Sequence, residues 1–144
     1  HMARVLAIDD DSGVLLFLKK SLACAGFGVL TEDNADSGFR AACRQRVDAI
    51  LLDVTMPGMD GLDLLKKLKA DERTQHIPVV MFTGQDNKEF KEQACFDYAE
   101  FYVLKTAGIE EIALRVRQAI AAAPRAPRRR PGLLDLLGLG MCRA

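Results

Sequence analysis

Short apolar runs alternate along the chain with longer stretches in which apolar residues recur every three or four positions. The short runs are typical of buried strands, and the longer spacing is typical of amphipathic helices. The predicted strands are Arg4–Ile8, Gly28–Thr31, Ala49–Leu52, Pro78–Phe82 and Phe101–Leu104. The predicted helices are Ser12–Ala25, Ala35–Arg46, Gly61–Ala70, Asn87–Cys95 and Gly108–Ala122. This alternation indicates an α/β fold with a parallel sheet and helices on both faces.

Polar residues stand where four of the apolar runs stop. They are Asp9 and Asp10 after VLAI, Asp53 after AILL, Thr83 after VVMF and Lys105 after FYVL. The carboxyl ends of parallel strands lie along one edge of an open sheet, and ligands bind in the crevice at that edge. We therefore expect these residues to share one pocket, although they are far apart in the sequence.

The acidic residues of this set suit a metal ion and a phosphoryl group. Adjacent carboxylates such as Asp9 and Asp10 repel each other unless a cation or a basic group neutralises them, and Mg²⁺ prefers oxygen ligands. The alternative for Asp9 and Asp10 is a solvated turn. Asp11 or Ser12 is expected to cap the next helix. A carboxylate placed like Asp53 can act as a nucleophile toward a phosphoryl group.

The hydroxyl of Thr83 and the ammonium of Lys105 complete this chemistry, because both can stabilise negative charge on a phosphoryl group. Either residue alone is weak support, since threonine often ends strands and lysine is usually solvated. The combination of all five positions is what predicts phosphoryl chemistry.

The segments VLAIDDDS, LLDVTMPGMDG, VVMFTG and FYVLK resemble the motifs of receiver (CheY-like) domains of bacterial two-component response regulators. The resemblance covers about residues 3–122. It implies a flavodoxin-like, CheY-like fold: a five-stranded parallel sheet in the order 2-1-3-4-5 with helices on both faces. Such a domain acts in a phosphorelay, so a phosphoprotein of the bacterial cytoplasm is expected.

The resemblance also implies a role for each site residue. Asp53 is the phosphoacceptor, and Thr83 and Lys105 contact the phosphoryl oxygens. The implied ligands of the cofactor Mg²⁺ are Asp9, Asp10, Asp53 and the backbone carbonyl of Thr55. Tyr102 is the aromatic switch residue, which turns inward when Thr83 moves toward the phosphoryl group. The surface formed by residues 87–95, 101–104 and 108–122 then changes shape.

Two positions depart from the family pattern. Thr106 follows Lys105 where the family usually has proline, often after a cis peptide bond, so the geometry of this loop is an open question. The stretch CFDYAEF replaces the small, glycine-containing turn that usually precedes the last strand. Its aromatic residues, Phe96 and Tyr98, and the neighbouring Phe101 belong either to the core or to a partner surface.

Composition separates the chain into a domain at residues 3–123 and a tail at residues 124–144. The tail begins with a Pro/Arg-rich linker, which we expect to be a solvated spacer and not a nucleic-acid site. Its Leu-rich part has leucine at positions 133, 134, 136, 137 and 139. So apolar a segment is expected to pack on its own domain, on a second chain or on a partner, and a homodimer is one possibility. The aromatic face of Phe96, Tyr98 and Phe101 is the favoured docking site.

Two further features set the cellular context. No apolar run approaches the roughly 20 residues that cross a bilayer, so we expect no membrane span. The cysteines are scattered, and we expect reduced, buried thiols in a cytoplasmic protein. They are Cys24, Cys43, Cys95 and Cys142. His1 resembles a cloning remnant and is left out of functional reasoning.

The predicted function is that of a receiver that accepts a phosphoryl group from a histidine kinase or phosphotransfer protein and signals through protein contacts. It is not an enzyme in the usual sense, because it catalyses only its own phosphorylation and dephosphorylation. One alternative is an interaction-only receiver. Others are a small Mg²⁺ phosphohydrolase, disfavoured because Thr55 replaces its second aspartate, and a flavodoxin, disfavoured because no Ser/Thr/Gly-rich loop follows the first strand. The sequence names neither the kinase nor the downstream target.

Overall fold

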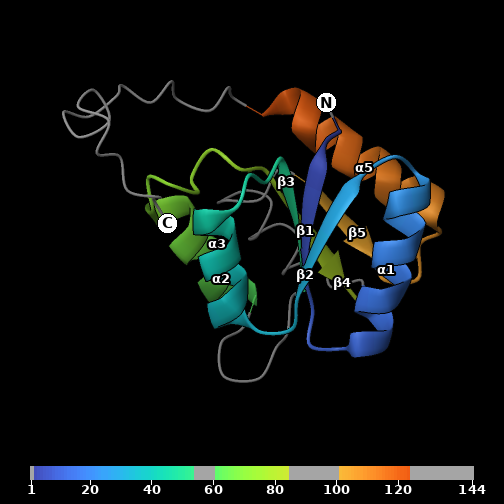
Figure 1. Cartoon of the computed structure of the whole chain (residues 1–144), viewed down its shortest axis with the longest axis horizontal. Coiled ribbons are helices and arrows are strands. Elements are labelled where there is room, and N and C mark those ends of the chain that lie inside the picture. The colour runs from blue at the N-terminus through green and yellow to red at the C-terminus, as the bar shows by residue number, and fades with distance from the viewer. Residues whose placement is uncertain (1, 54–60, 85–100, 124–144) are drawn as a thin grey trace, which may run out of the picture.

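The computed structural model describes residues 2–53, 61–84 and 101–123 (Figure 1). The strands are β1 (Arg4–Ile8), β2 (Gly28–Glu32), β3 (Ala49–Asp53), β4 (Val79–Thr83) and β5 (Phe101–Leu104). The helices in these ranges are α1 (Ser12–Cys24), α2 (Ala35–Arg44), α3 (Gly61–Ala70) and α5 (Ile109–Ala122). The helix expected at Asn87–Cys95 lies outside the described residues. Each described element matches a predicted one to within a few residues.

The five strands form one parallel sheet in the order β2-β1-β3-β4-β5. The predicted order is therefore confirmed. Figure 1 shows α1 and α5 on one side of the sheet and α2 and α3 on the other. Parallel neighbours need a crossover connection, and the helices that make these connections cover both faces of the sheet.

The side chains of the strands point alternately to the two faces of the sheet and so form two separate cores. One core, here called the α2/α3 core, takes from the sheet Leu6, Ile8, Ile50, Leu52, Val79 and Met81. The other, the α1/α5 core, takes Val5, Ala7, Ala49, Leu51, Val80, Phe82 and Val103. Successive side chains of a strand point to opposite faces, so β3 and β4, which are apolar up to their last residue, supply both cores at once.

The ends of the helices follow local chemistry. Asp11 is the N-cap of α1, and its Oδ1 accepts hydrogen bonds from the backbone amides of Gly13 at 2.8 Å and Val14 at 3.2 Å. The predicted cap is thus confirmed. After α1 the chain turns at Gly26, whose φ of 97° is a conformation that glycine adopts without steric cost.

The prediction of buried cysteines is wrong for the two that the structure describes. Cys24 is exposed and Cys43 is only half-buried, and both are unpaired. Cys24 lies in the last turn of α1, which packs on the sheet through Leu15, Leu18 and Leu22. Helical periodicity places Cys24 off this stripe, and this outweighs the general tendency of cysteine to be buried. Cys95 and Cys142 lie outside the described residues.

None of the helices in the described ranges has the length and apolar composition needed to span a bilayer.

Close packing of α2 on β1 depends on Gly38. A Cβ atom at this position would lie 2.7 Å from Cδ1 of Ile8, whose side chain is fully buried. We expect Gly38→Ala to lower the free energy of unfolding by about 1–2 kcal/mol through overpacking, even though alanine favours helix by up to about 1 kcal/mol. Urea denaturation would measure the change.

Ile8→Val removes the Cδ1 atom and should alone cost about 0.5–1.5 kcal/mol. In the double variant with Gly38→Ala the removed atom makes room for the added one. The double variant should then lose less unfolding free energy than the sum of the two single losses, by at least about 0.5 kcal/mol. Strict additivity would contradict this account of the α2–β1 contact.

The loop before β4 should make stability depend on pH through His76. Burial, with a smaller effect of the Lys69 charge, lowers the pKa of His76 below its ordinary value of 6.5. Below about pH 6.5 the unfolded chain therefore binds a proton that the folded protein resists, so stability is complete above this pH and declines as the pH falls toward the folded pKa.

His76→Gln should accordingly show a smaller loss of unfolding free energy than the natural chain when the pH is lowered from about 7.5 to 5.5. Urea titrations at several pH values would measure this difference. Equal losses in the two proteins would show that His76 does not carry the effect.

Candidate functional site

The predicted site residues come together at the carboxyl edge of the sheet. Asp53 and Thr83 are the last residues of β3 and β4, and Asp9 and Lys105 directly follow β1 and β5. The strand registers bring these ends level, since Ile8 pairs with Leu52, Asp53 with Phe82 and Thr83 with Leu104. Asp9, Asp53 and Thr83 are 1%, 3% and 5% exposed, so this edge holds buried polar groups.

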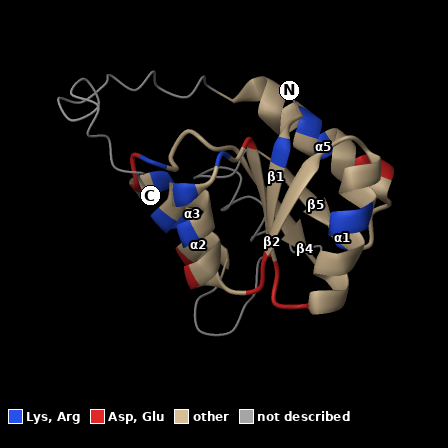
Figure 2. Cartoon of the chain, viewed as in Figure 1, with Lys and Arg blue, Asp and Glu red and all other residues tan. Residues whose placement is uncertain are grey.

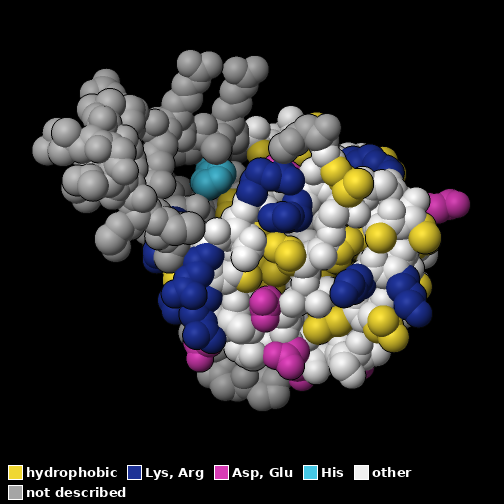
Figure 3. Space-filling view, in the orientation of Figure 1, with side chains coloured by type: hydrophobic (Ala, Val, Ile, Leu, Met, Phe, Trp, Pro, Cys, Tyr) yellow, Lys and Arg dark blue, Asp and Glu magenta, His cyan; other side chains and the backbone are white. Residues whose placement is uncertain are grey.

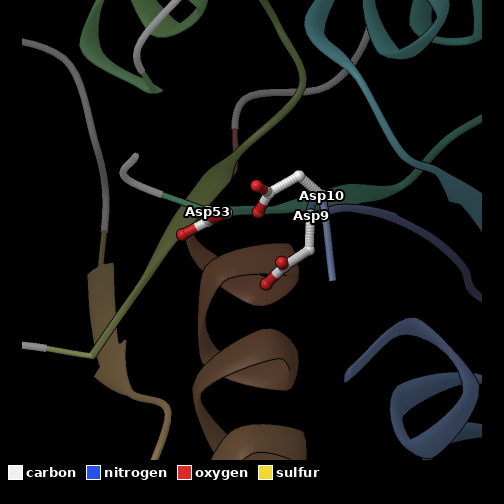
Figure 4. A group of neighbouring side chains, drawn as sticks. All are labelled: Asp9, Asp10 and Asp53. Atoms are coloured by element: carbon white, nitrogen blue, oxygen red, sulfur yellow. The ribbon is translucent and has the colours of Figure 1, made fainter. Parts of the chain in front are cut away.

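Three carboxylates gather at this edge (Figure 4). One oxygen from each of Asp9, Asp10 and Asp53 lies within 4.8 Å of the other two. Asp9 and Asp53 are buried, whereas Asp10 is exposed at the mouth of the site. Figure 2 shows acidic residues in the loops that follow β1 and β2, beside this edge. The predicted acidic cluster therefore forms.

Lys105 reaches into the cluster from the neighbouring strand end. Its Nζ lies 2.8 Å from Oδ2 of Asp9 and 3.2 Å from Oδ1 of Asp53. Although desolvation acts in the opposite direction, hydrogen bonding to Asp9 and the nearby negative charges raise the pKa of Lys105 above 10.5. The ammonium is therefore charged at neutral pH. It can also stabilise added negative charge at this edge.

The apolar neighbour of Lys105 was not expected from the sequence. Its Nζ lies 5.6 Å from the centre of the Phe82 ring. Phe82 pairs with Val103, two residues before Lys105, and both belong to the α1/α5 core. The two-residue period of strands could have indicated this, because residues 103 and 105 share one face.

The donor set fits a divalent cation with oxygen ligands. Three ionised carboxylates carry three negative charges, and Lys105 offsets one of them. Oδ2 of Asp9 is buried, and apart from its ion pair with Lys105 it accepts no hydrogen bond within the described ranges. A buried carboxylate oxygen is costly without a compensating partner, and Mg²⁺ readily takes such oxygens as ligands.

Thr83 and Tyr102 lie on the other side of the sheet from the lysine. Thr83 continues the alternation of Val79 and Met81, which point into the α2/α3 core. Tyr102 is partly buried against the same core. Because Thr83 pairs with Leu104, Thr83 and Tyr102 are diagonal neighbours on one face. This placement is the one that a coupled movement of the two side chains requires.

The absence of proline after Lys105 does not displace the lysine. None of the described peptide bonds is cis, so the bond between Lys105 and Thr106 is trans. The Lys105 amide donates to the carbonyl of Thr83 at 2.7 Å, and the Ala107 amide donates to that of Leu104 at 3.0 Å. These two hydrogen bonds hold the turn that directs the ammonium toward the carboxylates.

Some predicted features fall outside the described ranges. Thr55, whose carbonyl is an expected metal ligand, lies in residues 54–60, and Phe96 and Tyr98 lie in residues 85–100. Phe101 is described and is partly buried against the α1/α5 core. Phe101 therefore contributes to the core, while part of its side chain stays exposed.

Comparison with known proteins identifies the family. The model of the response regulator receiver domain matches residues 5–117. The DNA-binding dual master transcriptional regulator RpaA of Synechocystis sp. is 33% identical over 126 residues, which are 88% of this chain and 52% of RpaA. Heme response regulator HssR of Staphylococcus aureus is 32% identical over 119 residues, which are 83% of this chain and 52% of HssR. The chain thus spans about half the length of the curated relatives it matches.

Solved structures share the fold. Chemotaxis protein CheY4 of Vibrio cholerae superposes with a TM-score of 0.78 at 26% identity, covering 83% of this chain and 99% of CheY4. A response regulator receiver domain protein from Clostridium thermocellum superposes with a TM-score of 0.77 at 28% identity, covering 83% of this chain and 95% of that one. With the family model matching most of the sequence and the fold shared with solved receiver domains, the protein belongs to the response regulator receiver domain family.

Proposed function

We propose that the protein accepts a phosphoryl group on Asp53 from a histidine kinase or phosphotransfer protein and signals in the cytoplasm through protein contacts. The observation that carries this proposal is the setting of the Asp53 carboxylate. It lies at the end of a wholly buried strand, 3.2 Å from the ammonium of Lys105 and within 4.8 Å of the Asp9 and Asp10 carboxylates. Few structural roles would require so much charge at one edge.

The transfer step uses Asp53 as the nucleophile. A carboxylate oxygen of Asp53 forms a bond to phosphorus, while the bond from phosphorus to the donor's histidine nitrogen breaks and the nitrogen keeps the electron pair. Lys105 is held beside Asp53 and Asp9, so it can pair with a phosphoryl oxygen when the group arrives. The hydroxyl of Thr83, at the end of the adjacent strand, can donate a hydrogen bond to another oxygen.

Asp9, Asp10 and Asp53 would hold Mg²⁺ in this reaction, with the carbonyl of Thr55 as a further ligand. When bound, the ion supplies positive charge that offsets repulsion between the carboxylates and the phosphoryl oxygens. Exposed Asp10 stands at the mouth of the site, where the donor must enter. The backbone amide of Asp11 donates to Oδ1 of Asp9 at 2.9 Å, which orients the Asp9 carboxylate.

Phosphorylation would change the shape of the surface on the side of the sheet that carries Tyr102. A movement of Thr83 toward the phosphoryl group frees space on the side of the sheet where Tyr102 already packs. Tyr102 would turn into that space and change the surface beside β5, where a protein target binds. The switch is thus an electrostatic event at Asp53 that is read out as a packing change.

The nucleophile can be tested directly. Incubation with Mg²⁺ and acetyl phosphate, or with a cognate kinase, should add one phosphoryl group per chain, as measured by intact-protein mass spectrometry. Asp53→Asn should abolish the addition, because the amide keeps the size of the side chain but loses the nucleophilic charge. Asp36→Asn, at an exposed position in α2, is the matched control and should be labelled like the natural chain. Equal labelling of the Asp53→Asn variant would refute the assignment.

The division of roles between carboxylates and lysine can be tested by Mg²⁺ calorimetry. Asp10→Ala should weaken Mg²⁺ binding by about tenfold or more, because it removes a proposed ligand. Lys105→Ala should leave the affinity unchanged or raise it, because a positive charge is removed from within 3.2 Å of Asp53 while the ligands remain. An equal loss of affinity in both variants would contradict these roles.

A further inference from the structure

A groove lies at the amino edge of the sheet, at the opposite end of the strands from Asp53. Its volume is about 470 Å³, and it is enclosed by the segments that precede β3 and β4 together with the end of α5. The apolar part of its lining includes Val47, Ile77, Pro78 and Ile120. Arg46 and Arg73 stand at its rim, with side chains 46% and 48% exposed. Each pairs with a carboxylate, Arg46 with Asp48 at 2.6 Å and Arg73 with Asp71 at 2.9 Å. The groove is therefore apolar inside and has ion pairs at its rim.

One buried polar atom of the groove lacks a partner. Nδ1 of His76 has no exposed surface and makes no hydrogen bond within the described residues. Such an atom is costly unless another group reaches it. His76 lines the groove, so a docked segment would lie beside its ring and change the surroundings of this nitrogen. Figure 3 shows basic and hydrophobic side chains close together on the face of the described residues that it presents.

The chain itself supplies an apolar segment close to this groove. Ala123, the residue that follows α5, lines the groove, so the C-terminal segment starts at its wall. Residues 124–132 form a linker of nine residues, which reaches at most about 30 Å when extended. The Leu-rich part that follows can therefore turn back into the groove.

The pattern of this segment suits a short helix. Leu133, Leu136 and Leu137 have the i, i+3, i+4 spacing by which a helix presents one apolar face to a groove. On such a helix Asp135 falls on the opposite side, and Leu134 and Leu139 fall on the flanks. Gly138 and Gly140 suit the end of a helix, where the last carbonyls carry partial negative charge.

We propose that residues 133–139 of the same chain dock as a short helix in the groove beside Val47, Ile77 and Ile120. The linker keeps the segment at an effective concentration in the millimolar range, so a small apolar interface suffices to hold it. The Phe101 contacts with the α1/α5 core leave less support for docking on the aromatic face. The proposal does not depend on phosphorylation, because the groove and Asp53 lie at opposite edges of the sheet.

The alkylation rate of the Cys43 thiol can report whether the segment is docked. It is half-buried and lines the groove, whereas Cys24 is exposed on α1, outside the groove lining. The alkylation rate of each thiol by iodoacetamide can be followed separately by peptide mass spectrometry. Docking should shield Cys43 and leave Cys24 unaffected. Truncation after Ala123 should then raise the rate at Cys43 on the order of tenfold.

A pair of variants of equal composition tests the helix register. Leu136→Ser with Leu137→Ser should raise the Cys43 rate as truncation does, because both leucines lie on the proposed docking face. Leu134→Ser with Leu139→Ser, on the flanks, should leave the rate close to that of the full chain. Equal effects of the two pairs would overturn the proposed helix. Unchanged Cys43 rates in all variants would overturn docking altogether.

Two further measurements separate the remaining outcomes. A synthetic peptide of residues 131–141, added to the truncated protein, should slow alkylation of Cys43 again and shift the His76 ring resonances. This test does not rely on the folding of the tail variants. A Cys43 rate in the full chain that falls as protein concentration rises would show that a second copy supplies the segment, which would overturn docking within one chain.

Discussion

The ion pairs of Lys105 with Asp9 and Asp53 are the interaction on which the site depends. Two almost fully buried carboxylates lie next to a third, and without a compensating charge their repulsion would oppose folding of this edge. One ammonium, 2.8 Å from Asp9 and 3.2 Å from Asp53, compensates part of that charge. In the proposed function, the charge that remains would attract a cation, and the same ammonium would pair with an incoming phosphoryl group. Stability and the proposed chemistry thus use one set of contacts.

Because side chains alternate along a strand, the site residues at this edge lie on two different faces of the sheet. Asp9, Asp53 and Lys105 extend the rows that point to the α1/α5 core, whereas Thr83 extends the row that points to the α2/α3 core, where Tyr102 packs. The charged groups are therefore on one side and the proposed switch pair is on the other. Thr83 is next to both, since it ends the strand between β3 and β5. A single threonine can in this way couple charge at the site to packing on the opposite face.

The two edges of the sheet differ in character. The carboxyl edge collects charged groups, and the amino edge carries an apolar groove with ion pairs at its rim. A Leu-rich segment held at the amino edge would leave the carboxyl edge free for a phosphoryl donor. The two proposals are therefore compatible, because docking of the tail would not block exchange of a phosphoryl group with a partner.

The sequence by itself determined the elements, the sheet class and the identity of the site residues, because wholly apolar strands and amphipathic helices are local patterns and parallel strands must end at one edge. The sheet order and the proposed switch role of Tyr102 came from the resemblance to the family motifs, not from periodicity. Only the tertiary structure decided that the Lys105 ammonium pairs with both Asp9 and Asp53, and that the peptide bond between Lys105 and Thr106 is trans. It also decided that Phe101 packs partly against the α1/α5 core and that a groove opens beside Ala123. These features depend on contacts between segments distant in sequence, which no local pattern encodes.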